Sequence, residues 1–242
     1  MIKSKAVHDE NFVVIIPAAG VGKRMQAKCP KQYLTFLGKT ILEHTVERLL
    51  SHPKIARVII ALGEQDEYFT SLALHNHPQI STVIGGVERV DSVLAGLKSI
   101  DIKEFSWVLV HDAARPCVTH FDIDKLIDAC MQKKCGGLLA SPVRDTMKRG
   151  MNHGLVNKTE KRTDLWHALT PQMYPLEQLT QAIEQALTNQ QDITDESSAI
   201  ELAGFKSMLI AASSENIKIT QPDDLALAEF ILMKQHKNQE SV

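Results

Sequence analysis

Two glycines and three cations follow a short apolar run near the N-terminus. The run covers residues 13–16, and after it come Gly20, Gly22, Lys23, Arg24 and Lys31. Small residues let backbone N–H groups approach a polyanion, while lysine and arginine neutralise its charge. This order of residue types predicts a buried strand that ends in a loop able to hold the phosphates of a nucleoside triphosphate.

Two common phosphate loops do not fit this segment. A Walker loop has four residues between its glycines, whereas one residue separates Gly20 from Gly22. A dinucleotide fingerprint has a third glycine where Met25 stands, and an acidic residue about 20 positions later. An ordinary strand-to-helix turn is the simpler alternative, but the three cations favour phosphate binding.

A second apolar run ends in an acidic residue. Residues 107–110 predict a buried strand, and His111 and Asp112 follow it. Mg²⁺ prefers one or two carboxylates together with phosphate oxygens and water, so Asp112 is a candidate magnesium ligand. A solvated cap for the next helix is the alternative. We interpret His111 as a packed or hydrogen-bonded histidine. Arg115 could brace the loop or bind phosphate, and we favour the structural role.

Three further segments carry residues suited to a nucleotide site. Gly85 and Gly86 precede a helix, where glycine permits the close approach of a flat base and the Ser92 hydroxyl can read its edge; taken alone, a glycine-rich helix start is the simpler explanation. Lys218 lies late in an apolar run, and a lysine there is unusual without an anion to face. The acidic stretch 192–196 is expected to begin a helix.

Length and composition limit the class of protein. The 242 residues are 44% hydrophobic, which suits one large α/β domain, or one domain with an excursion. A net charge of −2 argues against a broad basic face for nucleic acid. The four cysteines form no metal-binding spacing, and no apolar run reaches membrane length. We therefore expect a cytoplasmic protein that binds neither nucleic acid nor a membrane.

Strand and helix signals alternate along the chain. Apolar runs predict strands at 12–16, 57–62, 81–84, 107–110, 138–141, 206–210 and 217–220. Thr40 with Glu43, and Thr119 with Asp122, are expected to cap helices, and Pro222 to open the last one. Alternation of this kind predicts a doubly wound, mainly parallel, Rossmann-like sheet flanked by helices, with ligands at the carboxyl ends of the strands.

Residues 142–165 interrupt the alternation. They hold few large apolar residues and turn at Asn152-His153-Gly154, which predicts a protruding β-hairpin arm. Because a two-stranded hairpin is marginally stable alone, we expect it to lean on something, such as a second subunit. A surface loop without regular structure is the alternative.

Seven motifs together resemble one enzyme family. They are Pro-Ala-Ala-Gly-x-Gly-x-Arg-Met with Pro-Lys-Gln-Tyr, Gly-Gly-x-x-Arg-x-x-Ser, Val-His-Asp-Ala-Ala-Arg-Pro, Pro-Val-x-Asp-Thr, Ala-Leu-Thr-Pro-Gln, Thr-Asp-Glu and Asn-Ile-Lys-x-Thr. In this order the chain resembles the 2-C-methyl-D-erythritol 4-phosphate cytidylyltransferases over nearly its whole length. The resemblance implies that CTP and methylerythritol phosphate give CDP-methylerythritol and pyrophosphate, with Mg²⁺ or another divalent cation, in non-mevalonate isoprenoid synthesis.

The resemblance also implies roles for individual residues. Catalytic roles fall to Arg24, Lys31 and Lys218, and the metal-associated acid is Asp112. Nucleotide-binding positions are Ala18, Ala19, Gly20, Gly22, Gly86, Arg89, Ser92 and Ala113. Methylerythritol phosphate binding is implied for Thr146, Arg162 and Thr170. Residues 1–242 would form a single nucleotidyltransferase domain, in which 142–165 act as a dimerisation and substrate-binding arm of a homodimer.

Other activities are weighed against this one. A ribitol-5-phosphate cytidylyltransferase would share the phosphate loop and differ mainly in its acceptor pocket. A nicotinamide-dependent dehydrogenase is disfavoured by the missing third glycine and the missing ribose-binding acid. A nucleotide-sensing protein with a vestigial site is disfavoured because Arg24, Lys31 and Lys218 are all retained.

Overall fold

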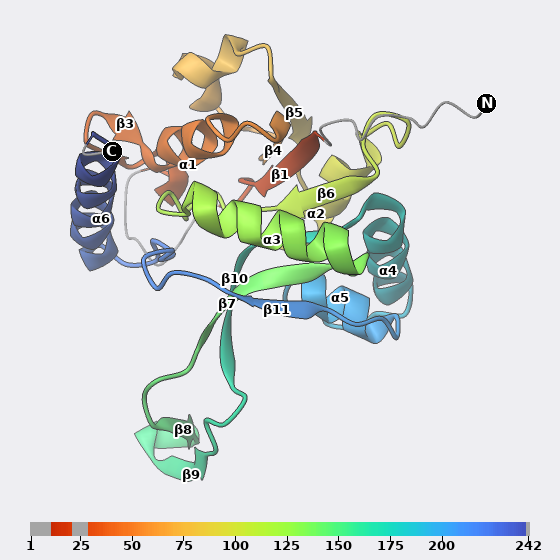
Figure 1. The fold of residues 1–242 in the computed structure, drawn as a ribbon, viewed down its shortest axis with the longest axis vertical. Coiled ribbons are helices and arrows are strands. Elements are labelled where there is room, and N and C mark those ends of the chain that lie inside the picture. The colour runs from red at the N-terminus through yellow and green to blue at the C-terminus, as the bar shows by residue number, and fades with distance from the viewer. Residues whose placement is uncertain (1–10, 21–28, 241–242) are drawn as a thin grey trace.

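A seven-stranded sheet forms the centre of the protein (Figure 1). The computed structural model describes residues 11–20 and 29–240. The strand order is β11-β7-β10-β6-β1-β4-β5. In chain order the strands are β1 Phe12–Pro17, β4 Ile55–Leu62, β5 Ile80–Ile84, β6 Trp107–Val110, β7 Gly137–Pro142, β10 Trp166–Pro175 and β11 Met208–Ala211. All neighbours pair in parallel except β10, which is antiparallel to both β6 and β7.

Helices cover both faces of this sheet, as the alternating pattern predicts. They are α1 Ile41–Leu50, α2 Arg89–Lys98, α3 His120–Lys133, α4 Leu176–Thr188, α5 Glu196–Leu202 and α6 Asp223–Glu240. Val14 and Ile16 of β1 are buried in a core with α1 and α3, whereas Val13 and Ile15 are buried with α2, α4 and α5. Because side chains alternate along a strand, β1 supplies both cores and its carboxyl end is held firmly.

The predicted helix caps form. Thr40 accepts a hydrogen bond from the Glu43 backbone, and the Glu43 carboxylate accepts one from the Thr40 backbone, which completes a capping box. Thr119 likewise accepts from the backbone of Asp122 at the start of α3. The last helix begins at Asp223, one residue after Pro222.

Six of the seven expected strands form within two residues of their expected bounds, and the seventh does not. Residues 217–220 are extended but belong to no strand. Ile219 donates a backbone hydrogen bond to the Ala114 carbonyl at 2.9 Å, so this segment follows the loop after β6 instead of joining the sheet. In its place the sheet contains β10, which the sequence pattern did not predict because Pro171 stands in its middle. A register shift between Ala168 and Gln172 accommodates the proline.

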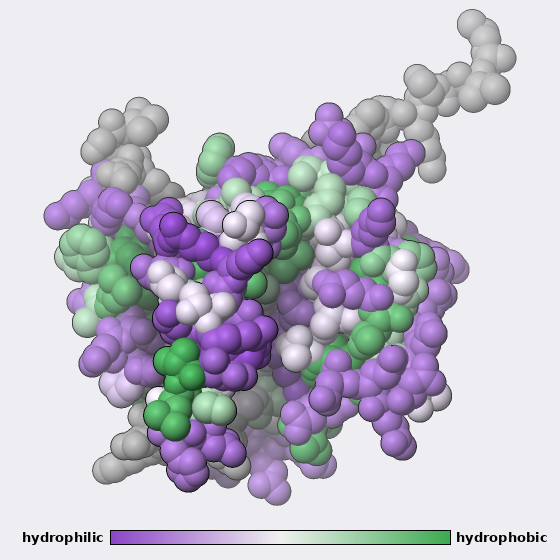
Figure 2. Space-filling view, turned by 90° about the horizontal axis from the view of Figure 1, so that it is seen from below, coloured by the Kyte–Doolittle hydropathy of each residue, from purple (hydrophilic) through white to green (hydrophobic). Residues whose placement is uncertain are grey.

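The segment after β7 leaves the body of the protein (Figure 1). β8 Met147–Gly150 pairs in antiparallel fashion with β9 Val156–Glu160, and the short helix η5 Asn152–Gly154 forms the turn. Among its side chains, Met151, Leu155 and Val156 are each more than half exposed. Seen from below, where the hairpin points toward the viewer, the surface is mostly hydrophilic with a small hydrophobic group at the front (Figure 2).

Short elements complete the fold. They are the two-stranded β2 Thr35–Phe36 and β3 Lys39–Thr40, and the 3₁₀ helices η2 Lys31–Tyr33, η3 Phe69–Ser71 and η4 Ala73–Asn76. In the part of the chain that the structure describes, no helix combines the length and the apolar character needed to cross a bilayer.

Candidate functional site

A cleft opens at the carboxyl ends of β1 and β6, where a doubly wound sheet places its ligands. Its volume is about 310 Å³. The cleft brings together ten of the residues that the sequence singled out, namely Ala18, Ala19, Gly20, Lys31, Gly86, Arg89, Ser92, Asp112, Ala113 and Lys218. Two others, Gly22 and Arg24, lie outside the described residues.

One wall of the cleft requires glycine. A Cβ atom on Gly86 would lie 2.2 Å from the Asp91 side chain, and one on Gly85 would lie 2.7 Å from Ser92 Oγ. The Gly86 backbone N–H donates to Ser92 Oγ at 3.2 Å. The Gly86 backbone and the Ser92 hydroxyl therefore hold each other in position where β5 leads into α2. This wall offers main-chain groups at close range to a planar ligand.

Three cations surround the carboxylate of Asp112. Its Oδ2 accepts a hydrogen bond from Arg115 Nε at 3.0 Å and lies 2.9 Å from Lys218 Nζ. Its Oδ1 lies 3.5 Å from Arg89 Nε. Burial alone would raise the pKa of Asp112, but Arg89, Lys218 and Arg115 outweigh it and hold that pKa well below its usual range. Asp112 is thus a fixed negative charge at neutral pH.

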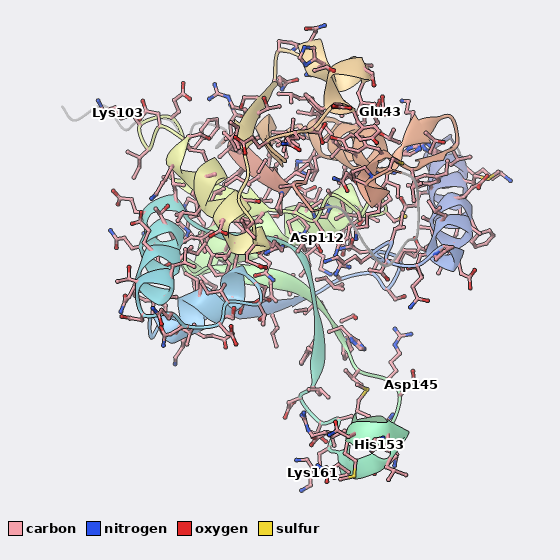
Figure 3. The ribbon with its side chains drawn as sticks, turned by 180° about the vertical axis from the view of Figure 1, so that it is seen from behind. Glu43, Lys103, Asp112, Asp145, His153 and Lys161 are labelled. Carbon is pink, nitrogen blue, oxygen red and sulfur yellow. The ribbon has the colours of Figure 1, made fainter. Side chains whose placement is uncertain are left out.

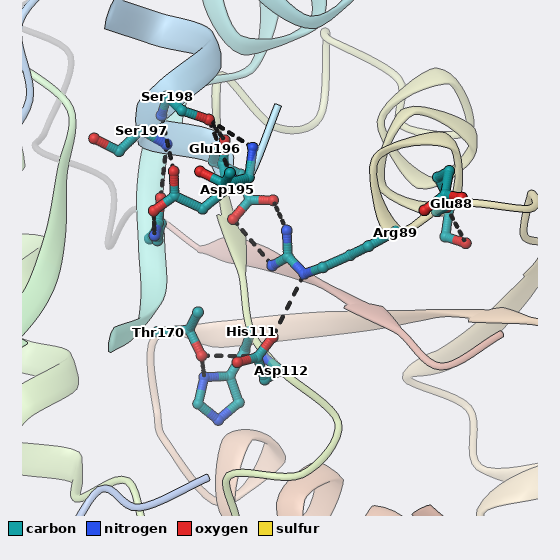
Figure 4. Close-up of polar contacts among 12 residues, drawn as sticks. Glu88, Arg89, His111, Asp112, Thr170, Asp195, Glu196, Ser197 and Ser198 are labelled. Atoms are coloured by element: carbon teal, nitrogen blue, oxygen red, sulfur yellow. Dashed lines mark hydrogen bonds and ion pairs between the residues drawn. The ribbon is translucent and has the colours of Figure 1, made fainter. Parts of the chain in front are cut away.

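Arg89 links Asp112 to helix α5 (Figure 4). Its Nη1 and Nη2 donate to the two carboxylate oxygens of Glu196 at 2.6 and 3.1 Å, a bidentate pair. Glu196 is 2% exposed. Burial opposes the charge of Arg89, yet Glu196 and Asp112 together raise its pKa above the usual range. Arg89 is therefore charged at neutral pH.

A buried hydrogen-bond chain fixes the backbone at Asp112. His111 Nε2 lies 3.0 Å from the Arg115 carbonyl, so this nitrogen must donate and Nδ1 must accept. Nδ1 then accepts from the Thr170 hydroxyl at 3.0 Å, and the same hydroxyl accepts from the Asp112 N–H at 3.0 Å. Burial lowers the pKa of His111 to about 4, which keeps it neutral. His111 is the hydrogen-bonded histidine that we expected.

Thr170 therefore sits behind Asp112 instead of lining the cleft. It is 5% exposed, and its hydroxyl proton is committed to His111. In the described structure Thr170 orders the acid. Donation from its hydroxyl to a substrate would require this hydrogen bond to be exchanged.

Lys218 reaches the cleft from the extended segment near the C-terminus. Arg115 Nη1 donates to the Asn216 carbonyl at 2.8 Å, and Asn216 Nδ2 donates to the Thr170 carbonyl at 2.8 Å. Arg115 thus braces both Asp112 and the segment that carries Lys218, which is the structural role that we favoured for it. Lys218 lies at the ligand-binding end of the sheet as predicted, although no strand holds it there.

Lys31 also lines the cleft. Its Nζ donates to the Ile219 carbonyl at 3.1 Å, so it lies beside the segment that carries Lys218. The neighbouring Gln32 is 3% exposed, and its Nε2 donates to the Ala18 carbonyl at 2.6 Å. Gln32 therefore ties η2 to the loop after β1. Cations from both ends of the chain face one space.

The donor set at Asp112 fits a magnesium ion that is bound together with phosphates. Oδ2 is taken by Arg115 and Lys218, whereas Oδ1 accepts no hydrogen bond from any described residue. No group of three or more His, Cys, Asp or Glu able to hold a metal occurs among the described residues. A single carboxylate oxygen suits Mg²⁺, which completes its shell with phosphate oxygens and water.

The two remaining predicted residues lie on the arm. Thr146 precedes β8, and Arg162 follows β9 and donates through Nη1 to the Arg144 carbonyl. Asp145, next to Thr146, lies on the arm and apart from Asp112 in the body (Figure 3). Within one chain, the arm residues and the cleft residues form separate groups.

Sequence reasoning missed three residues that build the cleft. Gln32 and Asn216 occur in quoted motifs, but nothing in the pattern assigned them a role. Glu196 was expected only to begin a helix. Nothing in the sequence distinguishes Glu196 from the neighbouring acids, because its burial at the start of α5 appears only in the structure.

Comparison with known proteins gives concordant results. Residues 12–234 match the family described as IspD: 2-C-methyl-D-erythritol 4-phosphate cytidylyltransferase. A relative of that name from Colwellia psychrerythraea is 61% identical, over 94% of this chain and 97% of its own. One from Vibrio vulnificus is 54% identical, over 93% and 96%. The crystal structure of the Francisella tularensis enzyme is similar with a TM-score of 0.77 at 37% identity, over 92% and 100%.

Proposed function

The chain belongs to the 2-C-methyl-D-erythritol 4-phosphate cytidylyltransferase family, and from that membership we propose that the cleft around Asp112 is its active site. The enzyme transfers the cytidylyl group of CTP to 2-C-methyl-D-erythritol 4-phosphate and releases pyrophosphate, a step of non-mevalonate isoprenoid synthesis. Three cations, Lys31, Arg89 and Lys218, line the cleft together with the carboxylate of Asp112. This convergence is the observation that carries the assignment.

Positioning and charge do most of the work in such a transfer. The acceptor's phosphate oxygen attacks the α-phosphorus of CTP, and the bond to the pyrophosphate oxygen breaks on the opposite side. A phosphate monoester has its second pKa near 6, so the attacking oxygen is already anionic at neutral pH and needs no general base. Lys31 is assigned to the leaving pyrophosphate and Lys218 to the α-phosphate. Arg24, which precedes Lys31, is proposed to act with it.

The glycine wall is assigned to the cytosine base. Gly86 offers main-chain groups at short range, and Ser92 Oγ is already oriented by the Gly86 N–H. Ala18, Ala19 and Ala113 are small enough to let the nucleotide reach the backbone on the facing side. Hydrogen bonds from fixed main-chain groups can select one base over another because their positions do not adjust.

Asp112 is assigned to a divalent cation through its Oδ1. The cation, when bound, neutralises phosphate charge as the α-phosphorus is attacked. Asp112 can fill this role because its carboxylate stays ionised and its backbone is fixed by Thr170. Arg115 and Lys218 hold the other oxygen, which orients the carboxylate.

The arm is assigned to a partner subunit and to the acceptor phosphate. Residues 144–164 contain six Lys or Arg and three Asp or Glu, a basic balance that favours a phosphate ligand. The exposed Met151, Leu155 and Val156 would be covered by a second copy of the chain. In a homodimer, Thr146 and Arg162 of one protomer would then complete the cleft of the other.

A cytoplasmic location is proposed as well. All four cysteines are free thiols, and burial raises the pKa of Cys117 and Cys130 to about 12. Unpaired cysteines are typical of a reducing compartment.

Product identity tests the function directly. The purified protein is incubated with CTP, Mg²⁺ and methylerythritol phosphate, with ribitol 5-phosphate in a parallel reaction. CDP-methylerythritol and pyrophosphate in equal amounts are expected from the first, and little product from the second. Preferential turnover of ribitol 5-phosphate would overturn the acceptor assignment.

A further inference from the structure

We propose that Glu196 is a positioning residue for the divalent cation: it holds the Arg89 guanidinium so that Oδ1 of Asp112 stays open for the cation. This inference rests on the proposed function, in which Asp112 is a ligand of that cation. It gives a role to a buried acid that the transfer mechanism does not use.

Glu196 is itself held in a rigid setting. It is the first residue of α5, and Asp195 caps the helix by accepting from the Ser198 N–H at 2.9 Å. The other oxygen of Asp195 accepts from Gln172 Nε2 at 2.9 Å, and Gln172 Oε1 accepts from the Ser197 N–H at 2.8 Å. The first turn of α5 is thereby fixed to β10. The backbone that carries the Glu196 carboxylate is therefore held in place.

Glu196 determines which part of Arg89 faces Asp112. A guanidinium presents five N–H groups in a planar fork. Glu196 takes Nη1 and Nη2, so the remaining Nε faces Asp112 Oδ1 at 3.5 Å, an ion pair without a good hydrogen bond. Figure 4 shows this arrangement, with the guanidinium between the two carboxylates. Arg89 therefore contributes charge near Asp112 without occupying its oxygen.

Without the Glu196 charge, the nearest suitable anion for Arg89 is Asp112. Both oxygens of Asp195 are already hydrogen-bonded, to Ser198 and Gln172. Asp112 Oδ1 accepts no hydrogen bond from a described residue, and Arg89 is 31% exposed and so has room to turn. A fork-to-carboxylate pair is the preferred geometry of arginine. An arginine bonded to Oδ1 and a metal bound to Oδ1 exclude one another.

Direct metal binding tests this role. Binding of Mn²⁺ to the protein with saturating CTP and no acceptor is followed by electron paramagnetic resonance, so that no turnover occurs. Glu196→Gln is expected to weaken Mn²⁺ binding by roughly tenfold or more, the usual range for outer-shell partners of a metal site. The matched control is Glu201→Gln, which removes the same charge from an exposed position on the same helix and should leave binding unchanged.

A double variant distinguishes a positioning role of Glu196 from a general disturbance of the site by its replacement. In Arg89→Gln with Glu196→Gln, no arginine competes for Asp112 and no buried charge is left unpaired. Because Arg89 is also a predicted nucleotide-binding residue, CTP is first titrated against this variant so that the measurement is made at saturation. Mn²⁺ binding should then return to within about threefold of the natural protein. Unchanged Mn²⁺ binding in Glu196→Gln, or equally weak binding in the double variant, would overturn the proposal. If Glu196→Gln does not fold, as judged by circular dichroism, Glu196→Asp takes its place, because the shorter side chain keeps the charge but cannot hold Arg89 in the same position.

The outcome is distinguishable from a failure of the proposed function. Asp112→Asn is measured in parallel and should lose Mn²⁺ binding whatever the role of Glu196. If Asp112→Asn binds Mn²⁺ normally, the metal assignment itself is wrong. If Asp112→Asn loses Mn²⁺ and Glu196→Gln does not, only the role of Glu196 is refuted.

Discussion

Lys218 Nζ lies 2.9 Å from Oδ2 of Asp112, although the two residues come from segments far apart in the chain. Asp112 follows a central strand, whereas Lys218 belongs to the extended segment before α6. Arg115 joins them, because it contacts both the Asp112 carboxylate and the Asn216 carbonyl. The ion pair therefore places the Lys218 ammonium group at a defined point beside the cleft.

Replacing Lys218 should reduce turnover strongly. Lys218→Met keeps the length of the side chain and removes its charge, and we expect kcat/KM for CTP to fall by about 10²–10³, the range found for loss of one oxyanion donor. Arg89 and Arg115 remain beside Asp112 and still lower its pKa. The acid limb of the pH–rate profile should therefore not move toward neutral pH. Lys206→Met, at an exposed site, serves as the control. A variant with near-natural kcat/KM would contradict the assignment.

Lys31 should act on the transition state more than on CTP binding. Lys31→Ala is expected to lower kcat by about 10²-fold while the KM for CTP changes little, because charge on the leaving pyrophosphate develops as the bond breaks. Steady-state kinetics with varied CTP separate the two parameters. Lys39→Ala, which breaks only the exposed pair with Glu47, should match the natural protein. A normal turnover number in Lys31→Ala would refute this role.

Arg162 should affect the acceptor and not the nucleotide. Arg162→Ala is expected to raise the KM for methylerythritol phosphate by tenfold or more, roughly the value of one charge-assisted hydrogen bond, with the KM for CTP unchanged. Arg149→Ala on the same hairpin, which loses a surface pair with Glu160, is the matched control. If CTP affinity alone suffers in Arg162→Ala, the arm does not serve the acceptor.

His111 should make folding stability depend on pH. Its pKa is about 4 in the folded protein against an ordinary value of 6.5, because burial disfavours the charged form. Below pH 6.5 the unfolded chain takes up a proton that the folded one does not, so the free energy of unfolding falls as pH decreases and levels off below about 4. The shift corresponds to a loss of about 3 kcal/mol.

Urea unfolding between pH 7 and pH 4 measures this dependence. His111→Gln, which can still donate to the Arg115 carbonyl, should be less stable at pH 7 but lose less stability on acidification. His167→Gln, at an exposed position on β10, should keep the natural pH dependence. An identical slope in His111→Gln and the natural protein would exclude His111 as its source.

Much of the fold follows from local rules in the sequence. The apolar runs of β1 and β6 and the capping box at Thr40 each specify their element with residues a few positions apart. Strand β10 escaped prediction because Pro171 lacks an N–H, and only the register shift visible in the sheet shows how it is accommodated. Residues 217–220 have the composition of a strand, but they pair with the loop after β6, a choice that only the folded arrangement decides.

In the cleft, too, local sequence predicts some features and long-range contacts decide the others. Its lining could be predicted from the glycine, lysine and aspartate residues near strand ends, because phosphate sites need residues of these kinds. The partners of those residues could not be predicted, since they depend on long-range contacts. Glu196 reaches Arg89 because helix α4 packs against both α5 and α2. Thr170 reaches His111 because β10 pairs with β6.

The placement of Lys218 has a consequence during protein synthesis. A ribosome releases the chain from its N-terminus, so the glycine wall and Asp112 emerge well before Lys218, the lysine proposed to contact the α-phosphate. A product cut short after α5 would retain the nucleotide-facing loops but lack both Lys218 and the Asn216 anchor. We therefore expect such a fragment to turn over CTP far more slowly than the whole chain, because it lacks the lysine proposed to contact the α-phosphate.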